Sequence, residues 1–285
     1  MSQPRSERTL LAVLAHPDDE TFGTGGTLAL YATRGVRVHL LCATRGEVGT
    51  VEPEKMAGFA TIGDLRQHEL ECAAQHLGLA GVHFLGYRDS GMPGTPDNHH
   101  PQALAAAPVE QVAAEVASWI RRLRPQVVLT FDPIGGYRHP DHIACHNATR
   151  LAFEAAGDPS RFPDGYAPFR PAKLYYHTFR RPWLRHGLRL LRLFGQDPRR
   201  WGRNRDIDLV DIAQHEFPVH ARIDIRAVLE RKRRATACHA SQVMPRPGLI
   251  GRWLFRFAEA EEVYMCAYPP PTPGLRERDL FEGVG

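Results

Sequence analysis

Short apolar segments alternate with helical patterns along most of this chain, and this alternation restricts the fold more than any other feature. Candidate strands cover residues 10–15, 36–43, 82–85, 127–131 and 173–179, and candidate helices cover residues 26–34, 64–77, 109–123 and 142–155. Strand and helix in turn build a parallel sheet that helices cover on both faces. The sequence therefore predicts an α/β fold, a three-layer Rossmann-like sandwich with a mostly parallel central sheet.

The 285-residue length fits one domain of this class, so we expect a single domain over residues 1–285. Residues 180–210 break the alternation, because leucines and aromatic residues are interleaved with arginines there. We expect an insertion at this point that contains a basic amphipathic helix, packed on its own domain rather than on a membrane surface. Residues 268–273 begin a proline-rich C-terminal tail that is expected to extend over the surface.

Composition excludes several functional classes. A hydrophobic content of 43% and a charged content of 24% are ordinary for a soluble protein, and no apolar run is long enough to cross a bilayer. The net charge of +4 is small and locally clustered, so nucleic-acid binding is not expected. Residues 1–8 lack a hydrophobic signal core, which predicts a cytoplasmic protein. The sequence leaves a homo-oligomer open.

The five cysteines do not indicate a disulfide framework. Their number is odd and they contain no Cys-x-x-Cys pair, so a thiolate zinc site is not indicated either. We expect all five to be reduced and mostly buried, namely Cys42, Cys72, Cys145, Cys238 and Cys266.

A cluster of ionisable residues follows the first predicted strand. Residues 16–20, His-Pro-Asp-Asp-Glu, come directly after the apolar run at residues 10–15. Ionisable groups are costly to bury, and ligands of α/β proteins usually bind at the carboxyl ends of the strands. Pro17 ends the strand, so the carboxylates fall in the turn and the first helical positions. The cluster predicts the metal site of a hydrolase.

A second cluster repeats this design. Residues 137–142, Tyr-Arg-His-Pro-Asp-His, follow the strand at residues 127–131 and a loop. Two such clusters can converge at one edge of a sheet. His16, Asp19 and His142 can then supply three nitrogen and oxygen ligands, which leaves the open fourth position of a catalytic zinc site. The same donors accept other divalent ions such as Fe²⁺.

Each cluster alone has a simpler interpretation. Acidic residues are favourable at any helix N-terminus, and a histidine in a turn is usually a polar surface residue. The position of both clusters behind strands favours the metal site. His146, four residues after His142, is a weaker candidate for a further ligand, because three ligands already suffice for zinc.

These clusters carry a resemblance to a known family. Residues 15–20 (Ala-His-Pro-Asp-Asp-Glu), 25–28 and 139–142 (His-Pro-Asp-His) resemble the signature motifs of the LmbE or PIG-L family of zinc-dependent N-acetylglucosaminyl deacetylases. The resemblance continues at residues 44–47, 66–70, 87–92 and 238–242, so it spans most of the chain. It implies an LmbE-like fold and a hydrolase that removes acetyl from an N-acetylglucosamine-containing substrate.

The resemblance also implies roles for individual residues. His16, Asp19 and His142 would bind zinc, and Asp18 would be the general base. Zinc acidifies a water and polarises the amide oxygen, while a nearby carboxylate can take a proton and pass it to the leaving amine. Asp18 adjoins a ligand without being one, which suits that role.

Further residues are expected around the reacting oxygen. A protonated His139 would stabilise the tetrahedral oxyanion, with Asp141 as the partner that keeps it charged. Tyr137 matches a mobile tyrosine of related deacetylases that assists at the same oxygen. Gly135 and Gly136 would give its loop that freedom.

For substrate contacts the resemblance points to Glu47, Arg66 and Asp89. Charged groups can fix sugar hydroxyls through directional hydrogen bonds, and an arginine can hold an anion in a bidentate manner. We expect Arg66 to meet a phosphate or carboxylate on the aglycone of a malate-linked or inositol-linked glucosamine. The alternative for each of the three residues is a surface ion pair.

The sequence thus predicts an enzyme that acts on a small amino-sugar conjugate and releases acetate and a free amine. An amidase for a larger N-acyl glycoconjugate or thiol conjugate comes second, because the lysine that we associate with that branch is replaced by residues 21–23, Thr-Phe-Gly. A non-catalytic sugar-binding module is disfavoured, since binding alone needs no general base. A protein that contacts membranes through the basic helix is also less favoured.

Overall fold

The computed structural model describes residues 7–179, 187, 188, 191, 195–201, 205, 207–242 and 260–284. Their strands form one seven-stranded sheet in the order β3-β2-β1-β4-β5-β7-β6. The strands are β1 (Thr9–Leu14), β2 (Arg37–Thr44), β3 (Gly81–Tyr87), β4 (Val127–Phe131), β5 (Lys173–Thr178), β6 (Ala221–Asp224) and β7 (Glu261–Tyr268). Neighbours from β3 to β5 are parallel, whereas β7 is antiparallel to both β5 and β6.

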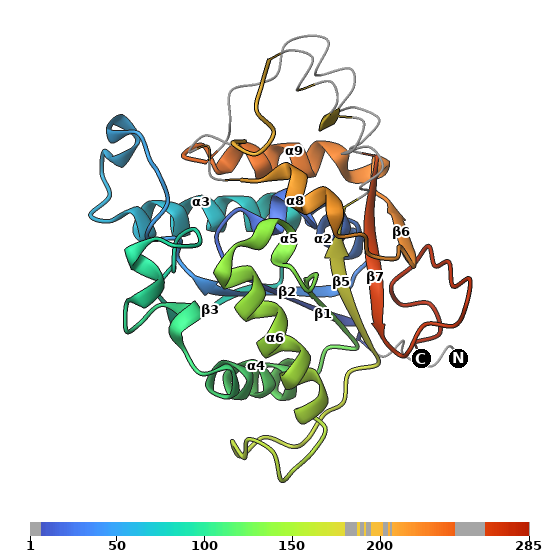
Figure 1. Cartoon of the computed structure of the whole chain (residues 1–285). Coiled ribbons are helices and arrows are strands. Elements are labelled where there is room, and N and C mark those ends of the chain that lie inside the picture. The colour runs from blue at the N-terminus through green and yellow to red at the C-terminus, as the bar shows by residue number, and fades with distance from the viewer. Residues whose placement is uncertain are drawn as a thin grey trace.

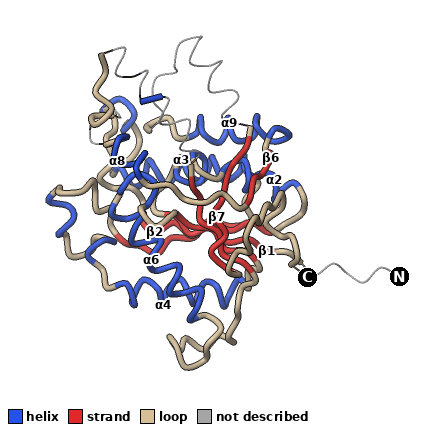
Figure 2. Tube along the Cα trace, turned by 45° about the vertical axis from the view of Figure 1, so that its right-hand side comes forward, coloured by secondary structure: helices blue, strands red, loops and turns tan. Residues whose placement is uncertain are grey.

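Helices cover both faces of the sheet (Figure 1). On one face lie α2 (Gly25–Thr33), α3 (Ile62–Leu77) and α9 (Leu229–Cys238), and on the other lie α4 (Val109–Leu123) and α6 (Pro140–Ala155). The turned view in Figure 2 shows the strands between these two layers. The shorter helices are α1 (Asp19–Phe22), α5 (Gly135–Arg138) and α8 (Leu209–Gln214), and single 3₁₀ turns cover Pro53–Met56, Pro96–His99, Leu104–Ala106 and Arg226–Val228. The predicted three-layer α/β fold is confirmed.

The central strands are apolar because they are buried on both sides. Every residue of β1 and of β4 is buried. Leu11 of β1 lies beside His39 of β2 and Val128 of β4, in parallel register. Continuous apolar runs are what a parallel sheet between two helical layers requires. All five predicted strands are present, and β6 and β7 extend the sheet beyond them.

One prediction about the cysteines is wrong. Cys72 of α3 and Cys238 at the end of α9 form a disulfide across 166 sequence positions, and both helices pack side by side on one face of the sheet. The other three cysteines, Cys42, Cys145 and Cys266, are free and buried as expected. Sequence spacing did not reveal the pair because only the packing of α3 on α9 brings the two sulfurs together.

The C-terminal tail differs from the expectation in its second half. Residues 269–274 are exposed, but Leu280 and Phe281 are buried in the hydrophobic core. The ring of Phe281 contacts Tyr31 of α2 edge to face, and the Tyr31 hydroxyl donates to Asp279. The tail therefore completes the core instead of extending over the surface.

Most of the predicted insertion at 180–210, including most of its basic amphipathic helix, falls outside the described residues. Leu188 of this segment is buried. Within the part of the chain that the structure describes, no helix is long and apolar enough to cross a membrane. The single-domain organisation stays a prediction.

The strand order reverses between β1 and β4. From β1 the chain continues outward to β2 and β3, whereas β4 and β5 lie on the other side of β1. At such a switch point the loops that follow the two strands diverge and leave a crevice beyond their carboxyl ends, where α/β proteins bind ligands. Both predicted clusters follow β1 and β4, so the fold brings them to this crevice.

Candidate active site

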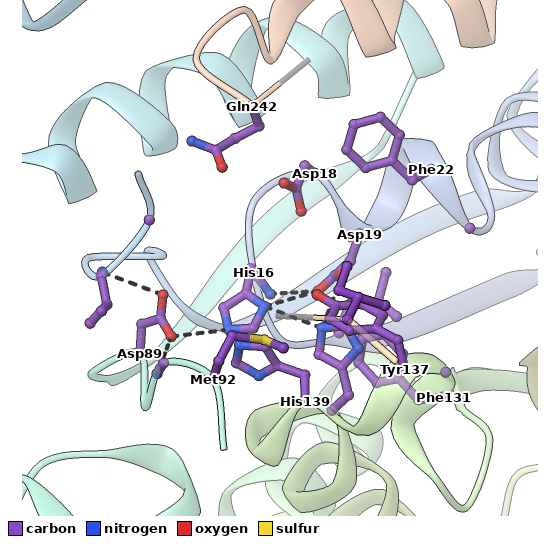
Figure 3. Close-up of a pocket in the computed structure, with 18 of the residues that line it drawn as sticks. His16, Asp18, Asp19, Phe22, Asp89, Met92, Phe131, Tyr137, His139 and Gln242 are labelled. Carbon is purple, nitrogen blue, oxygen red and sulfur yellow. Dashed lines mark hydrogen bonds and ion pairs between the residues drawn. The ribbon is translucent and has the colours of Figure 1, made fainter. Parts of the chain in front are cut away.

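A pocket of about 630 Å³ opens at this switch point. Its wall includes residues from the loops after β1, β2, β3, β4 and β5, as well as the segment after α9. Figure 3 shows His16, Asp19 and His139 in its floor, with Asp18 between Phe22 and Gln242 above them. The pocket is also lined by the side chains of Arg66, Asp89, Met92, Tyr137, His142, His177 and Phe179.

Three predicted ligands meet in the floor. His142 Nε2 lies 3.3 Å from His16 Nδ1 and 3.3 Å from Asp19 Oδ1, and His16 Nδ1 lies 3.5 Å from Asp19 Oδ2. A tetrahedral site with metal–ligand bonds of about 2.1 Å places its ligand atoms about 3.4 Å apart. The distance between the two nitrogens and the distance from each nitrogen to its nearer carboxylate oxygen are close to this value, so the set is compatible with a divalent metal.

The outer nitrogens of both histidines are held by the protein. His16 Nε2 lies 3.0 Å from Asp141 Oδ2, and His142 Nδ1 lies 3.1 Å from the Gly135 carbonyl oxygen. Partners of this kind fix the tautomer and the ring plane of metal-binding histidines. Each ring consequently turns its other nitrogen toward Asp19. Burial would raise the pKa of Asp19, but His142 and His16 hold that pKa well below its usual value, so the carboxylate is ionised.

Asp18 lies beside this set with a strained backbone. Its φ of 121° is in the region that only glycine adopts readily. Although Asp18 precedes α1, its side chain does not cap that helix. The carboxylate lines the pocket, and Arg66 Nη2 donates to its Oδ2 at 3.1 Å. Burial raises the pKa of Asp18 to about 6, against the opposing effect of Arg66.

Arg66 has partners within the protein, and its contact with an anionic aglycone stays a prediction. Its guanidinium donates to the Pro17 carbonyl at 2.6 Å, to the Gly46 carbonyl at 3.0 Å and to Asp18, and the residue is only 4% exposed. The protein thus engages Nη1 and Nη2, while the buried Nε has no hydrogen-bond partner among the described residues. Arg66 therefore positions Asp18 and the loop that carries it.

The expected pairing of His139 with Asp141 is wrong. His139 is the N-cap of α6, and its Nδ1 accepts the backbone N–H of Asp141 at 3.2 Å. A nitrogen that accepts carries no proton, so the ring is neutral and its hydrogen is on Nε2. Burial, followed by the rings of His16 and His142, lowers the pKa of His139 well below its usual value. The Asp141 carboxylate instead contacts His16 and accepts from the Ser90 backbone N–H and hydroxyl.

Tyr137 lies against the site. Its ring makes edge contacts with His139 and His142. Burial raises the pKa of Tyr137 above its usual value, so its hydroxyl is protonated. The two preceding glycines have φ of 63° and 68°, and a Cβ on Gly135 would approach His142 Cβ to 2.7 Å. This turn requires glycine, both for its dihedral angles and for space.

The other two predicted substrate residues differ in position. Asp89 is 4% exposed and lines the pocket, where its Oδ1 lies 3.5 Å from His16 Nε2 and accepts from the Gly91 N–H at 2.8 Å. Burial would lower the pKa of His16, but Asp89 and Asp141 raise it. Glu47 Oε2 accepts from the Asp89 backbone N–H at 3.0 Å. Glu47 therefore supports the loop that carries Asp89, without being one of the residues that line the pocket.

Sequence reasoning did not single out several residues of the pocket. His177 at the end of β5 lines it, and burial lowers the pKa of this histidine to about 4. Phe22 and Phe179 also line the pocket, and they are 48% and 46% exposed. A histidine near the carboxyl end of a predicted strand was the available signal for His177. His146, the weaker ligand candidate, points elsewhere: its Nδ1 lies 2.9 Å from the Phe131 carbonyl oxygen.

The site combines two imidazoles and a carboxylate at metal-compatible spacing with a second carboxylate beside them, and it lies at the switch point of an α/β sheet. This arrangement is that of a metal-dependent hydrolase. The chain belongs to the PIG-L family, because residues 11–153 match the family model described as GlcNAc-PI de-N-acetylase. The predicted family is confirmed, and with it an enzyme that hydrolyses an amide.

Full-length relatives agree with this family. The chain is 42% identical over 296 residues to the 1D-myo-inositol 2-acetamido-2-deoxy-alpha-D-glucopyranoside deacetylase of Rhodococcus opacus, and 39% identical over 296 residues to the deacetylase of the same name from Rhodococcus jostii. Both alignments cover 98% of this chain and 99% of the relative. The structure of N,N'-diacetylchitobiose deacetylase from Pyrococcus horikoshii shares the fold, with a TM-score of 0.61 and 19% identity over 92% of this chain and 84% of that one.

Proposed function

We propose that this N-acetylglucosaminyl deacetylase acts on N-acetylglucosamine joined to an unphosphorylated inositol, and that its resident metal is zinc. The observation that carries the substrate is the similarity to inositol-conjugate deacetylases over nearly the whole chain, at 42% and 39% identity. The products are acetate and the free amine of the glucosaminyl-inositol.

The charge of the pocket supports a neutral aglycone. Among the described lining residues, Arg66 carries the one permanent positive charge, and Asp18 and two carbonyls engage it. A malate or phosphate group needs a cation or several free donors to offset the loss of its hydration. Inositol presents hydroxyl groups, which the Asp89 carboxylate and the Gln242 amide of the pocket can bind without an excess of positive charge.

The donor set supports zinc. Two imidazole nitrogens and one carboxylate at tetrahedral spacing are the ligands of catalytic zinc sites, with the fourth position free for water or substrate. Fe²⁺ binds the same donors, so metal analysis must distinguish zinc from iron. When bound, zinc polarises the amide carbonyl and acidifies a water.

The protein's own groups then move the protons. The Asp18 carboxylate takes the proton of the attacking water and passes it to the leaving nitrogen. His139 donates its Nε2 hydrogen to the oxygen that becomes negative as the carbonyl is attacked, and it does so as a neutral ring. The protonated hydroxyl of Tyr137 is a second donor for that oxygen.

A comparison of substrates tests the proposal. Acetate release should be measured on N-acetylglucosamine linked to inositol, malate, lipid and oligosaccharide, together with the amide of a thiol conjugate. We expect the inositol conjugate to give the highest kcat/KM. A higher kcat/KM on any other member of the panel would contradict the proposed substrate.

Metal analysis tests the site. The purified chain should hold about one zinc per chain, and His142→Ala should lose most of it. Asp18→Ala should keep zinc and lose at least about a hundredfold in kcat. Full metal and activity in His142→Ala, or unchanged turnover in Asp18→Ala, would refute the assignment of these residues.

We propose a cytoplasmic location, and a homo-oligomer stays open. The disulfide between Cys72 and Cys238 weighs against this location, because the cytosol usually keeps cysteines reduced. Fractionation of expressing cells and light scattering of the purified chain test these two points.

A further inference from the structure

Glu20 ends the first acidic cluster, and neither the metal set nor the proton transfers use it. The residue is fully buried, and so is His239, which follows the last residue of α9. Glu20 Oε1 lies 2.6 Å from His239 Nε2, and Glu20 Oε2 accepts the backbone N–H of Asp18 at 2.9 Å. A buried carboxylate thus connects α9 directly to the backbone of the proposed base.

The peptide bond between Pro17 and Asp18 is held at both of its polar atoms. Arg66 Nη2 donates to its carbonyl oxygen at 2.6 Å, and Glu20 accepts from its N–H at 2.9 Å. The orientation of this peptide plane sets φ of Asp18, which is 121°. A non-glycine residue keeps such a φ only where its surroundings impose it. The two contacts are therefore the means by which the fold imposes it.

We propose that Glu20 and His239 are positioning residues for catalysis: they hold the Pro17–Asp18 peptide so that the Asp18 carboxylate faces the pocket instead of capping α1. Without the Glu20 contact, Asp18 can return to an ordinary N-cap conformation, in which its side chain accepts from the helix. The carboxylate is then lost to the pocket. This inference rests on the proposed role of Asp18 as the base.

His239 is itself anchored on two sides. The preceding residue, Cys238, is joined to Cys72 of α3. Two residues later, the Ser241 N–H and hydroxyl donate to Glu69 of α3 at 2.7 and 2.6 Å. The segment after α9 is thus fixed to α3 before and after His239, which gives Glu20 a rigid partner.

The test compares Glu20→Ala with Glu20→Gln, since the glutamine amide oxygen can still accept from the Asp18 N–H. We expect Glu20→Ala to lose at least about tenfold in kcat, with KM within about twofold and the metal retained, because a misplaced base slows the chemical step without weakening substrate binding. Glu20→Gln should stay within about threefold of the wild-type kcat. Amide hydrogen exchange should also speed up at Asp18 in Glu20→Ala.

Glu262→Ala is the matched control. Glu262 is a buried carboxylate that accepts the N–H groups of Gly26 and Thr27 at 2.8 and 2.7 Å, in α2 rather than at Asp18. Its substitution should lower the melting temperature without changing kcat. If Glu20→Ala does not fold, His239→Ala against His239→Gln gives the same comparison, because the glutamine still presents an N–H donor to Glu20.

The inference is overturned if the alanine variant keeps the wild-type kcat, if alanine and glutamine lose kcat equally, or if the loss of kcat coincides with loss of the metal. A wild-type chain that releases no acetate from any N-acetylglucosamine conjugate overturns the proposed function instead. The two failures are therefore distinguishable.

Discussion

Replacement of Arg66 by alanine separates the role that the structure gives this residue from the role that the sequence suggested. The wild-type side chain is 4% exposed and donates to the carbonyls of Pro17 and Gly46 and to the Asp18 carboxylate, at 2.6, 3.0 and 3.1 Å. Alanine removes all three bonds and leaves a cavity the size of the guanidinium. A buried carboxylate then loses its charge partner.

The size of the effect follows from these contacts. Breaking a buried ion pair by removing one partner costs about 3–5 kcal/mol. The Asp18 side chain is 17% exposed, so water can offset part of this loss, while the unpaired Pro17 carbonyl adds about 1 kcal/mol. We expect a loss of about 3–4 kcal/mol in the free energy of unfolding. For a chain of 285 residues that corresponds to a fall of about 6 °C in Tm.

Thermal unfolding and steady-state kinetics should be measured on the same preparation. Arg45→Ala is the control, because Arg45 forms an ion pair with Asp64 in which the two side chains are 42% and 41% exposed, and such pairs contribute only about 0–1 kcal/mol. For Arg66→Ala we expect a lower Tm and a lower kcat. A Tm within about 2 °C of the wild type, together with a raised KM, would refute our reasoning and restore the direct contact with substrate.

Three further predictions concern stability and the metal. Cys72→Ser should lower the free energy of unfolding by up to about 5 kcal/mol, because the disulfide closes a long loop; identical urea curves for the wild type with and without reductant would contradict this. Burial lowers the pKa of His39 to about 4, so as the pH falls the unfolded chain binds a proton at His39 before the folded chain does. The free energy of unfolding should therefore fall by about 1–3 kcal/mol from pH 6.5 to pH 4. Urea titrations at several pH values should show a weaker pH dependence in His39→Gln. Gly135→Ala should lower the metal content, because the added Cβ would collide with His142. Gly165→Ala is the control: Gly165 has φ of 83° and open space around it, so the variant should lose only about 1 kcal/mol in stability and keep the metal. Equal metal content in the two variants would show that the turn at Gly135 does not need glycine to position His142.

The sequence predicted the five parallel strands of the sheet but not the two antiparallel strands, β6 and β7. β1 and β4 are continuous apolar runs, which double-sided burial requires, so their pattern identified them. β6 has four residues that alternate between buried and exposed, and β7 follows it only after a long interval. A short edge strand such as β6 is determined by its partner more than by its own composition, and that partner, β7, is distant in sequence.

At the site, the sequence indicated which polar residues follow the strands and missed most of their contacts. His16, Asp19 and His142 could be grouped because the ends of neighbouring strands meet. The partner of Asp141 could not be found in this way: the side chains two positions apart on a helix diverge, so Asp141 faces His16 rather than His139. The hydrogen bonds of Arg66 could not be predicted either, because they depend on how the turn after β1 packs against α3.

The three predicted metal ligands are divided between the segment after β1 and helix α6, which has a consequence for the order of metal binding. His16 and His142 are 126 positions apart, so during synthesis the first histidine leaves the ribosome long before the second. A nascent chain that ends before α6 can hold at most two of the three ligands, and its affinity for metal is correspondingly weak. A metal bound by all three residues would therefore be captured only after both segments have been synthesised, and it would cross-link the two halves of the sheet, which β1 and β4 join.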